Sequence, residues 1–260
     1  MDCTPEHPKD TIRPELLDFS PYVPGQSMAE IRRDLGLDTV IKMASNENPL
    51  GTSPLVTKTV QRRADLVFRY PRPNSPDLAS ALGRHLGLAE DRLVIGNGSD
   101  EIIDLLIRVL ARPGQDRILI LDPSFSIYRL QARLCGVELT KIPLNPDFSF
   151  PLSQILAAAD QNTAMVFLTN PDNPSGYTAP REELIDLARS LPRRTMLIVD
   201  EAYVEFADQP SSFSPLPLFE ELDNVVLLRT FSKLYGLAGL RLGYGIMPAW
   251  LSDLLHRVKL

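Results

Sequence analysis

Lys233 is the residue of this sequence with the greatest potential for chemistry. It follows Ser232 in RTFSKLYGLAGLRLGYG, residues 229–245, and the chain then carries no charge until Arg241. A lysine that water solvates poorly has a lowered pKa, and its neutral amine can form a Schiff base with a carbonyl carbon. Most lysines of any protein are solvated surface groups, so the surroundings of Lys233 must decide between the two roles.

An anion site is predicted where the apolar run RLVI ends. The next residues, GNGSDEIIDLL, place glycines in a tight turn and Ser99 as the expected N-cap of a helix. The amides of Ser99 and Asp100, aided by the helix dipole, would bind a phosphate, but an ordinary capped turn explains the same pattern equally well. Glu101 stands where the dinucleotide fingerprint G-x-G-x-x-G requires its third glycine, so a nicotinamide cofactor is not favoured.

Two further polar side chains follow apolar runs. Asn173 lies in NPDNPSG, after AMVFLT, among prolines and a glycine that favour a rigid loop, although a plain turn is equally consistent with it. Asp200 ends TMLIVD, and a carboxylate at the end of a buried strand needs a cationic or hydrogen-bonding partner. That partner could be a ligand, the start of the next element or a structural arginine.

Alternating strand and helix patterns position these residues. The strand-like runs RLVIG, RILIL, AMVFLT, TMLIVD and NVVLLRT are separated mostly by helical patterns, such as SPDLASALGRHLG with Ser75 as candidate N-cap. Consecutive apolar positions in MLIV and VVLL are typical of parallel strands covered by helices on both faces. We therefore predict a doubly wound α/β fold, mostly parallel, in which ligands bind beyond the carboxyl ends of the strands. The anion turn, Asn173, Asp200 and Lys233 would share that edge.

Composition restricts the function classes. The 260 residues are 44% hydrophobic and 23% charged with a formal net charge of -6, which indicates a globular protein without a basic face for nucleic acid or a polybasic tail for membranes. Cys3 and Cys135 form no metal-type pair, and neither a signal peptide nor an apolar span of about 18 residues is recognisable. We expect a cytoplasmic protein that acts on small molecules and uses no metal.

One ligand would use all of these groups. Pyridoxal 5'-phosphate (PLP) needs a lysine for its aldehyde, an aspartate for its ring nitrogen, donors for its phenolate oxygen and a phosphate cradle. In order and spacing, NPDNPSG, DEAYVEF and TFSKLYGLAGLRLGY resemble the fold-type I PLP-dependent aminotransferases. SPYVPG, ASNENPLG, RYPRP and GNGSDEIIDLL make the chain similar to the histidinol-phosphate aminotransferases within that family, from about Ser20 to the end of the sequence.

The resemblance implies a role for each matching position. Lys233 would bind the aldehyde, Asp200 the pyridine nitrogen, and Asn173 with Tyr203 the phenolate oxygen. Tyr128 would stack on the cofactor ring. The groups expected to bind the phosphate are the amides of Ser99 and Asp100, the hydroxyls of Thr230 and Ser232, and the guanidinium of Arg241. The tyrosine matching Tyr70 would reach the phosphate of a second subunit, which implies a homodimer.

The implied activity is amino-group transfer between histidinol phosphate with 2-oxoglutarate and imidazole acetol phosphate with glutamate, in histidine biosynthesis. Lys233 would bind the cofactor and, once the substrate amine displaces it, would move a proton as acid and base. Residues 1–50 would form an N-terminal arm and part of the small domain, and residues 51–260 the large PLP-binding domain of the aspartate aminotransferase-like fold. The rest of the small domain, with the arginine for the glutamate carboxylate, is expected beyond Leu260, so a species of 260 residues is expected to be poorly active.

Two alternatives remain open. The threonine-phosphate decarboxylases of cobalamin synthesis have a similar set of cofactor loops, although SPYVPG and NENPLG favour the aminotransferase. A non-catalytic regulator or interaction protein with the PLP fold belongs to another class. Lys233 with its surrounding residues argues against that class, as does the lack of a basic helix-turn-helix segment.

Overall fold

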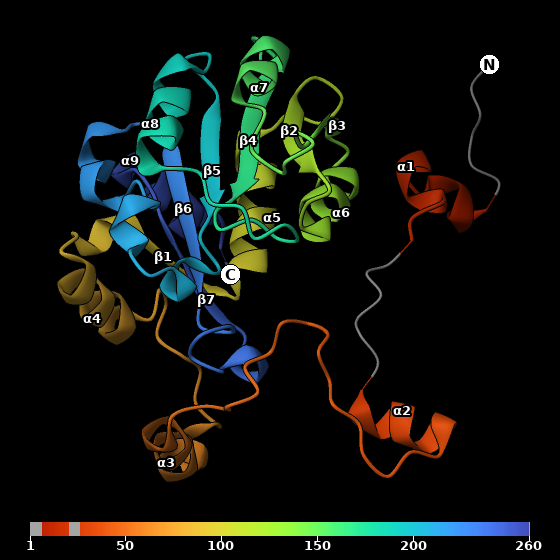
Figure 1. Cartoon of the computed structure of the whole chain (residues 1–260), viewed down its shortest axis with the longest axis vertical. Helices are drawn as coiled ribbons and strands as arrows, with labels where there is room; N and C mark the ends of the chain where they lie inside the picture. Colours follow the sequence, from red (N-terminus) through yellow and green to blue (C-terminus); the bar gives the residue numbers. More distant parts are fainter. Residues whose placement is uncertain (1–6, 21–26, 260) are drawn as a thin grey trace.

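The computed structural model describes residues 7–20 and 27–259 (Figure 1). The motif SPYVPG therefore lies almost entirely outside the described residues. The described part contains one sheet, whose strands are β1 Leu93–Asn97, β2 Arg117–Asp122, β3 Glu138–Pro143, β4 Thr163–Thr169, β5 Met196–Asp200, β6 Val225–Thr230 and β7 Leu242–Ile246. Its α-helices are α1 Pro14–Leu17, α2 Met28–Leu35, α3 Pro54–Arg63, α4 Pro76–Leu86, α5 Ser99–Leu110, α6 Ser126–Leu134, α7 Leu152–Ala158, α8 Arg181–Ser190 and α9 Ala249–Val258.

The strands lie in the order β1-β7-β6-β5-β4-β2-β3. Neighbouring strands are parallel except for β7, which is antiparallel to both β1 and β6. Because β7 runs opposite to both of its neighbours, β1 and β6 point the same way. The carboxyl ends of β1, β4, β5 and β6 therefore meet at one edge of the sheet, as the sequence predicted, and the mostly parallel α/β fold is confirmed.

The sequence patterns did not predict β3 or β7. The edge strand β3 is only partly buried, so its sequence ELTKIP lacks a continuous apolar run. The sequence of β7, LGYGI, contains two glycines, which weaken any strand signal. β7 forms because β1 and β6 supply a hydrogen-bonding ladder on each side of it.

Helices cover both faces of the sheet, and alternate strand residues point to opposite faces. In β4, Val166 and Leu168 belong to the apolar cluster that includes Leu184 of α8. Phe167, between them, belongs to the cluster that includes Ile103 of α5. This two-sided burial explains the apolar runs in the strands.

The start of α5 differs from the prediction in one respect that matters for the site. Gly98 is the N-cap, and Ser99 is the first helical residue rather than the cap. Gly98 has φ 78°, a left-handed conformation that glycine adopts at little cost. Ser75 does precede α4, but at φ 43° its side chain makes no capping hydrogen bond. At α5 the amide of Ser99 is therefore one of the free donors of the first turn.

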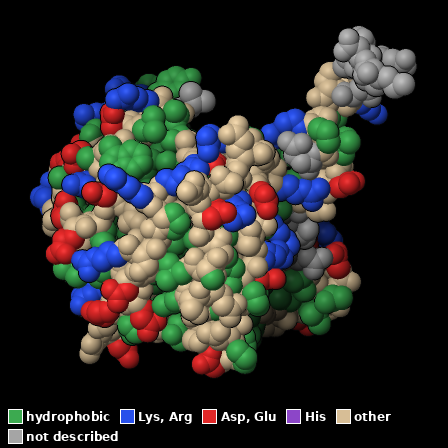
Figure 2. All heavy atoms as spheres, turned by 90° about the horizontal axis from the view of Figure 1, so that it is seen from above, with side chains coloured by type: hydrophobic (Ala, Val, Ile, Leu, Met, Phe, Trp, Pro, Cys, Tyr) green, Lys and Arg blue, Asp and Glu red, His purple; other side chains and the backbone are tan. Residues whose placement is uncertain are grey.

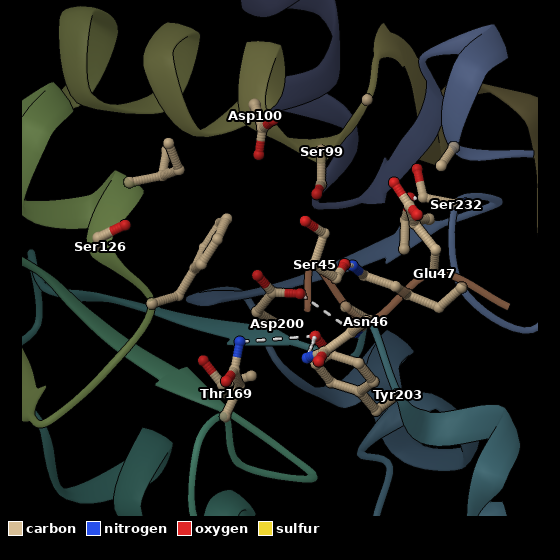
Figure 3. A pocket seen from close by; sticks show the side chains of 18 of the residues that line it. Ser45, Asn46, Glu47, Ser99, Asp100, Ser126, Thr169, Asp200, Tyr203 and Ser232 are labelled. Atoms are coloured by element: carbon tan, nitrogen blue, oxygen red, sulfur yellow. Dashed lines mark hydrogen bonds between the residues drawn. The ribbon is translucent and has the colours of Figure 1, made fainter. Parts of the chain in front are cut away.

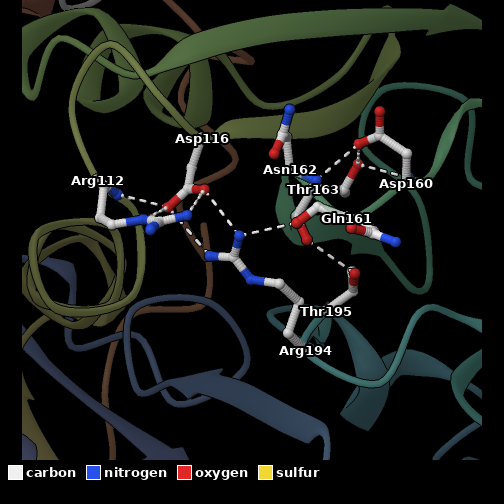
Figure 4. Close-up of polar contacts among 8 residues, drawn as sticks. All are labelled: Arg112, Asp116, Asp160, Gln161, Asn162, Thr163, Arg194 and Thr195. Carbon is white, nitrogen blue, oxygen red and sulfur yellow. Dashed lines mark hydrogen bonds and ion pairs between the residues drawn. The ribbon is translucent and has the colours of Figure 1, made fainter.

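A buried carboxylate joins the segments that adjoin α5, β2 and β5 (Figure 4). Asp116, only 1% exposed, lies just before β2 and accepts hydrogen bonds from the guanidinium of Arg112 at 2.9 and 3.0 Å. The guanidinium of Arg194, just before β5, donates to the same carboxylate at 2.8 and 3.0 Å. This cluster connects the segment after α5 to the starts of two central strands.

The N-terminal helices α2 and α3 lie outside the compact body that surrounds the sheet (Figure 1), whereas α1 contacts α6 through a hydrogen bond from Arg13 to the carbonyl oxygen of Leu134. None of the described helices is long and apolar enough to cross a lipid bilayer. On the face seen in Figure 2, basic and acidic side chains are interspersed, and no large area of one sign stands out.

Candidate active site

A cavity of about 600 Å³ opens at the carboxyl edge of the sheet (Figure 3). Strand ends, the start of α5 and an N-terminal segment contribute its walls, which include Ser45, Asn46, Glu47, Ser99, Asp100, Phe125, Thr169, Asn173, Asp200, Tyr203, Thr230, Ser232, Lys233 and Arg241. The structure thus brings together all of the predicted site residues except Tyr128 and Tyr70.

One end of the cavity has the composition of an anion site. Ser99 and Asp100 open α5, and Arg241 lies opposite them, with its Nη2 donating to Asp100 Oδ2 over 2.8 Å. A guanidinium carries five N–H donors, so this ion pair leaves others available to a ligand. An ideal Cβ at Gly98 would lie 2.6 Å from Arg241 Nη2, so the glycine keeps this space open for the guanidinium.

Thr230 and Ser232 contribute hydroxyls beside the same end. Both side chains are largely buried and line the cavity. Thr230 Oγ1 accepts the amide hydrogen of Ser232 over 3.1 Å and lies 3.5 Å from the carbonyl oxygen of Leu242. Together with the start of α5 and Arg241, these hydroxyls fit a phosphate group.

Gly243 allows β7 to approach the start of α5, and its substitution gives a testable prediction. A Cβ there would lie 2.5 Å from the backbone nitrogen of Ser99 and 2.7 Å from the carbonyl carbon of Gly98. We expect Gly243→Ala to lower the free energy of unfolding by about 1–3 kcal/mol, because backbone rather than a flexible side chain must move. Urea denaturation measures this change. Gly239→Ala is the control, because nothing lies within 4 Å of its ideal Cβ, and equal losses in both variants would contradict the prediction.

Asp200 lies at the end of β5, where only 2% of the residue is exposed. Its Oδ2 accepts a hydrogen bond from the hydroxyl of Tyr128 over 2.8 Å, and its Oδ1 accepts the amide hydrogen of Ala202 over 3.1 Å. Burial raises the pKa of Asp200 to about 6, against the lowering effect of these two donors. Asp200 is therefore a carboxylate that faces a cavity and is poised to bind a cationic or N–H group.

Lys233 reaches the same cavity from the loop after β6. Its Nζ donates to the carbonyl oxygen of Ser45 over 2.9 Å. Burial lowers the pKa of Lys233, an effect that the carboxylates of Asp100 and Asp200 partly oppose. The lysine thus has a larger neutral fraction than a solvated one, which a nucleophilic amine requires.

Tyr203 lies beside Lys233 and has its hydroxyl held by two amides. Asn46 Nδ2 donates to the Tyr203 oxygen over 2.9 Å, and Asn173 Nδ2 lies 3.5 Å from the same oxygen. Because both amides act as donors, the tyrosine retains its own proton for a ligand. Burial is the main cause of its raised pKa, so the hydroxyl keeps that proton at neutral pH.

The predicted stacking role of Tyr128 is not supported by its position. The residue is fully buried and lies behind Asp200 instead of lining the cavity. Phe125, just before α6, lines the cavity instead, as does Tyr203, whose hydroxyl is held by Asn46. A flat ring in the cavity would therefore meet Phe125. Tyr70 is 100% exposed and does not line the cavity of its own chain.

An N-terminal segment completes the site in a way that the sequence analysis did not assign. Ser45 and Asn46 contact Lys233 and Tyr203, which lie more than 150 positions later in the chain. Asn48 and Thr52 continue this contact through hydrogen bonds to the carbonyl groups of residues 234 and 235. The motif ASNENPLG was the available signal, but a turn-forming sequence does not reveal its distant partner.

The family of the chain follows from its similarity to known proteins. The sequence model of aminotransferase classes I and II matches residues 38–259, and the chain belongs to this family. It is 57% identical to a histidinol-phosphate aminotransferase of Oleidesulfovibrio alaskensis, over 96% of this chain and 65% of that protein. A second such enzyme, from Nitratidesulfovibrio vulgaris, is 54% identical over 96% of this chain and 67% of its own length. The chain thus spans about two thirds of the length of these relatives.

A solved structure with a similar fold is histidinol-phosphate aminotransferase from Sinorhizobium meliloti, in complex with pyridoxal-5'-phosphate. It superposes with a TM-score of 0.85 at 28% identity and covers 96% of this chain and 66% of its own. This similarity supports the assignment of the aminotransferase fold to the described part of the chain.

Proposed function

We propose that this chain is the PLP-binding part of a histidinol-phosphate aminotransferase. The observation that carries the proposal is the meeting of Lys233, Asp200 and the start of α5 in one cavity. A lysine with a lowered pKa, a buried carboxylate and an anion site at the opposite end fit an aldehyde, a ring nitrogen and a phosphate. The identity of 57% to a histidinol-phosphate aminotransferase supports the choice of substrate.

The residues of the cavity have separate tasks in this proposal. When bound, PLP supplies an aldehyde carbon and a pyridinium ring that draws electrons from the α-carbon of a substrate. Lys233 Nζ would hold the aldehyde and would carry a proton to and from the substrate α-carbon. Asp200 would hold the proton on the ring nitrogen, while Tyr203 and Asn173 would donate to the phenolate oxygen.

The phosphate would be bound by the groups at the start of α5 and after β6. The amides of Ser99 and Asp100, the hydroxyls of Thr230 and Ser232, and Arg241 surround that end of the cavity. Phe125 replaces Tyr128 as the residue proposed to stack on the ring.

The wider features of the protein belong to the same proposal. Histidinol phosphate and glutamate would donate the amino group, and imidazole acetol phosphate and 2-oxoglutarate would accept it, in the cytoplasm. Residues 1–50 would form an arm and part of the small domain, with residues 51–260 as the large domain. We also propose a homodimer in which Tyr70 reaches the phosphate of a second subunit, since its fully exposed side chain is free to do so.

Reduction with borohydride tests the proposed function. The purified chain is incubated with PLP, its absorbance spectrum is recorded, and the reduced adduct is located by peptide mapping. We expect a yellow species before reduction and the pyridoxyl group on Lys233 afterwards. No absorbance change, or a label on another lysine, would refute the site.

The substrate is tested by adding histidinol phosphate to the loaded protein. Loss of the yellow colour with formation of pyridoxamine phosphate supports the aminotransferase. Release of carbon dioxide from threonine phosphate would favour the decarboxylase instead. Because a species of 260 residues is expected to be poorly active, even a slow reaction supports an enzyme. A loaded protein that shows no reaction at all with either substrate would indicate the non-catalytic class.

A further inference from the structure

Tyr128 makes the only side-chain hydrogen bond to Asp200 found among the described residues. A carboxylate has no proton to give, so the hydroxyl of Tyr128 is the donor in the 2.8 Å contact with Asp200 Oδ2. Thr169 Oγ1 lies 2.9 Å from the same hydroxyl oxygen. Because the single proton of Tyr128 is already used, Thr169 donates to Tyr128, and the three groups form a directed chain that ends on Asp200.

Packing holds Tyr128 in this position. Its ring stacks on Phe167 of β4, with centroids 4.8 Å apart and planes 25° from parallel. It also meets Phe125 edge-on at 5.6 Å. Phe125 immediately precedes α6 and Tyr128 comes one turn later, so α6 brings one ring to the cavity wall and one hydroxyl behind Asp200.

The charges around Asp200 show why this donor matters. Burial disfavours the carboxylate form, and the carboxylates of Asp100 on α5 and of Glu201 next in the chain add to this effect. Lys233, in the loop after β6, is a cation that attracts the Asp200 carboxylate. Besides the hydroxyl of Tyr128, the amide of Ala202 is the donor that favours the ionised form.

We propose that Tyr128 is a positioning residue that keeps Asp200 ionised and fixes the direction of its carboxylate toward the cavity. The inference rests on the proposed function for the identity of the group that Asp200 meets, which is a protonated ring nitrogen. The orientation and ionisation of Asp200 are properties of this chain alone. They can be measured in the absence of any cofactor.

The test is a titration of Asp200 in the full chain freed of bound cofactor. Aspartate carbons are labelled with ¹³C, and Asp200→Asn identifies the carboxyl resonance of Asp200. In Tyr128→Phe, which removes one oxygen, we expect the pKa of Asp200 to rise by about one to two pH units, because a charge-assisted donor is lost. Thr169→Val removes only the donor to Tyr128, so we expect a smaller rise of less than about one unit.

Tyr177→Phe is the matched control. Tyr177 packs edge-on against Phe150, away from the cavity, so this variant should leave the Asp200 titration unchanged. A Tyr128→Phe protein that is folded by near-ultraviolet circular dichroism but titrates like the wild type would overturn the proposal. A purely structural role would lower stability without moving this titration.

If Tyr128→Phe does not fold, Thr169→Val tests whether the Thr169–Tyr128 hydrogen-bond chain keeps Asp200 ionised. In that case an unchanged pKa of Asp200 in Thr169→Val overturns the proposal, and a raised pKa supports it. The titration needs no cofactor, so its outcome is independent of the borohydride experiment. A failure of the proposed function would appear there, as a missing label on Lys233.

Discussion

Replacing Lys233 with alanine is expected to abolish the borohydride-stable label and to slow the reaction with histidinol phosphate by at least about 10³-fold. The side chain is the amine that lies in the cavity with Asp200 and Tyr203. Without it, no group at this position could bind the aldehyde or move the proton at the α-carbon. Stopped-flow absorbance of the loaded protein, mixed with histidinol phosphate, measures the rate.

Two variants serve as controls for this prediction. Lys233→Arg keeps a positive charge but not a nucleophilic amine, since a guanidinium stays protonated at any usual pH, so it should lose the label as alanine does. Lys141→Ala removes an exposed lysine of β3 that pairs with Asp122 over 3.4 Å, and it should react as the wild type does. Labelling and turnover that survive in Lys233→Ala would remove Lys233 from the mechanism.

Replacing Asp116 with asparagine is expected to lower the free energy of unfolding by about 2–3 kcal/mol at neutral pH. The change leaves the guanidinium groups of Arg112 and Arg194 facing a neutral amide (Figure 4). This expected loss is no larger than the loss caused by breaking a fully buried ion pair, because both arginines are partly solvated. Urea denaturation measures the loss. The control is Asp253→Asn, which breaks a surface pair with Arg257 and should cost no more than about 0.5 kcal/mol.

The effect of Asp116→Asn should depend on pH. Hydrogen bonds from Arg112 and Arg194 hold the pKa of Asp116 well below its usual range. A carboxylate with a lowered pKa in the folded state stabilises the protein fully above its unfolded pKa, and this contribution disappears as pH falls toward the folded value. The difference between wild type and variant should thus be constant above about pH 5 and should shrink below about pH 4. A difference that grows on acidification would contradict this account.

The sequence predicted the type of most core elements well because their periodicity is local. Apolar runs such as MLIV identified strands buried on both faces, and the structure has β5 there. Polar residues at the ends of such runs or in the loops that follow them, Asp200 and Asn173 among them, could be assigned to the ligand-binding edge before any contact was known. The same local signals were too weak for β7, where Gly243 is explained by the close approach of the start of α5.

The position of Tyr128 shows what helix periodicity cannot resolve. The sequence pattern indicated a helix at α6, and the family resemblance implied that Tyr128 stacks on the cofactor ring. The two aromatic residues near the start of α6, however, have opposite environments. Phe125 lines the cavity, whereas Tyr128 turns inward to Asp200. Which ring faces which side depends on how α6 packs on β4, a contact between segments separated in the sequence.

By itself, the sequence determined the α/β alternation, the family and the lysine, aspartate and asparagine at the strand ends, because each depends on residues that are close together in the chain. Only the tertiary structure decided that Asn46 reaches Tyr203, that Ser45 binds the amine of Lys233 and that Tyr128 supports Asp200. These contacts join residues that are 72 to 188 positions apart. Such contacts depend on how the sheet and its helices pack against one another, so no local sequence pattern predicts them.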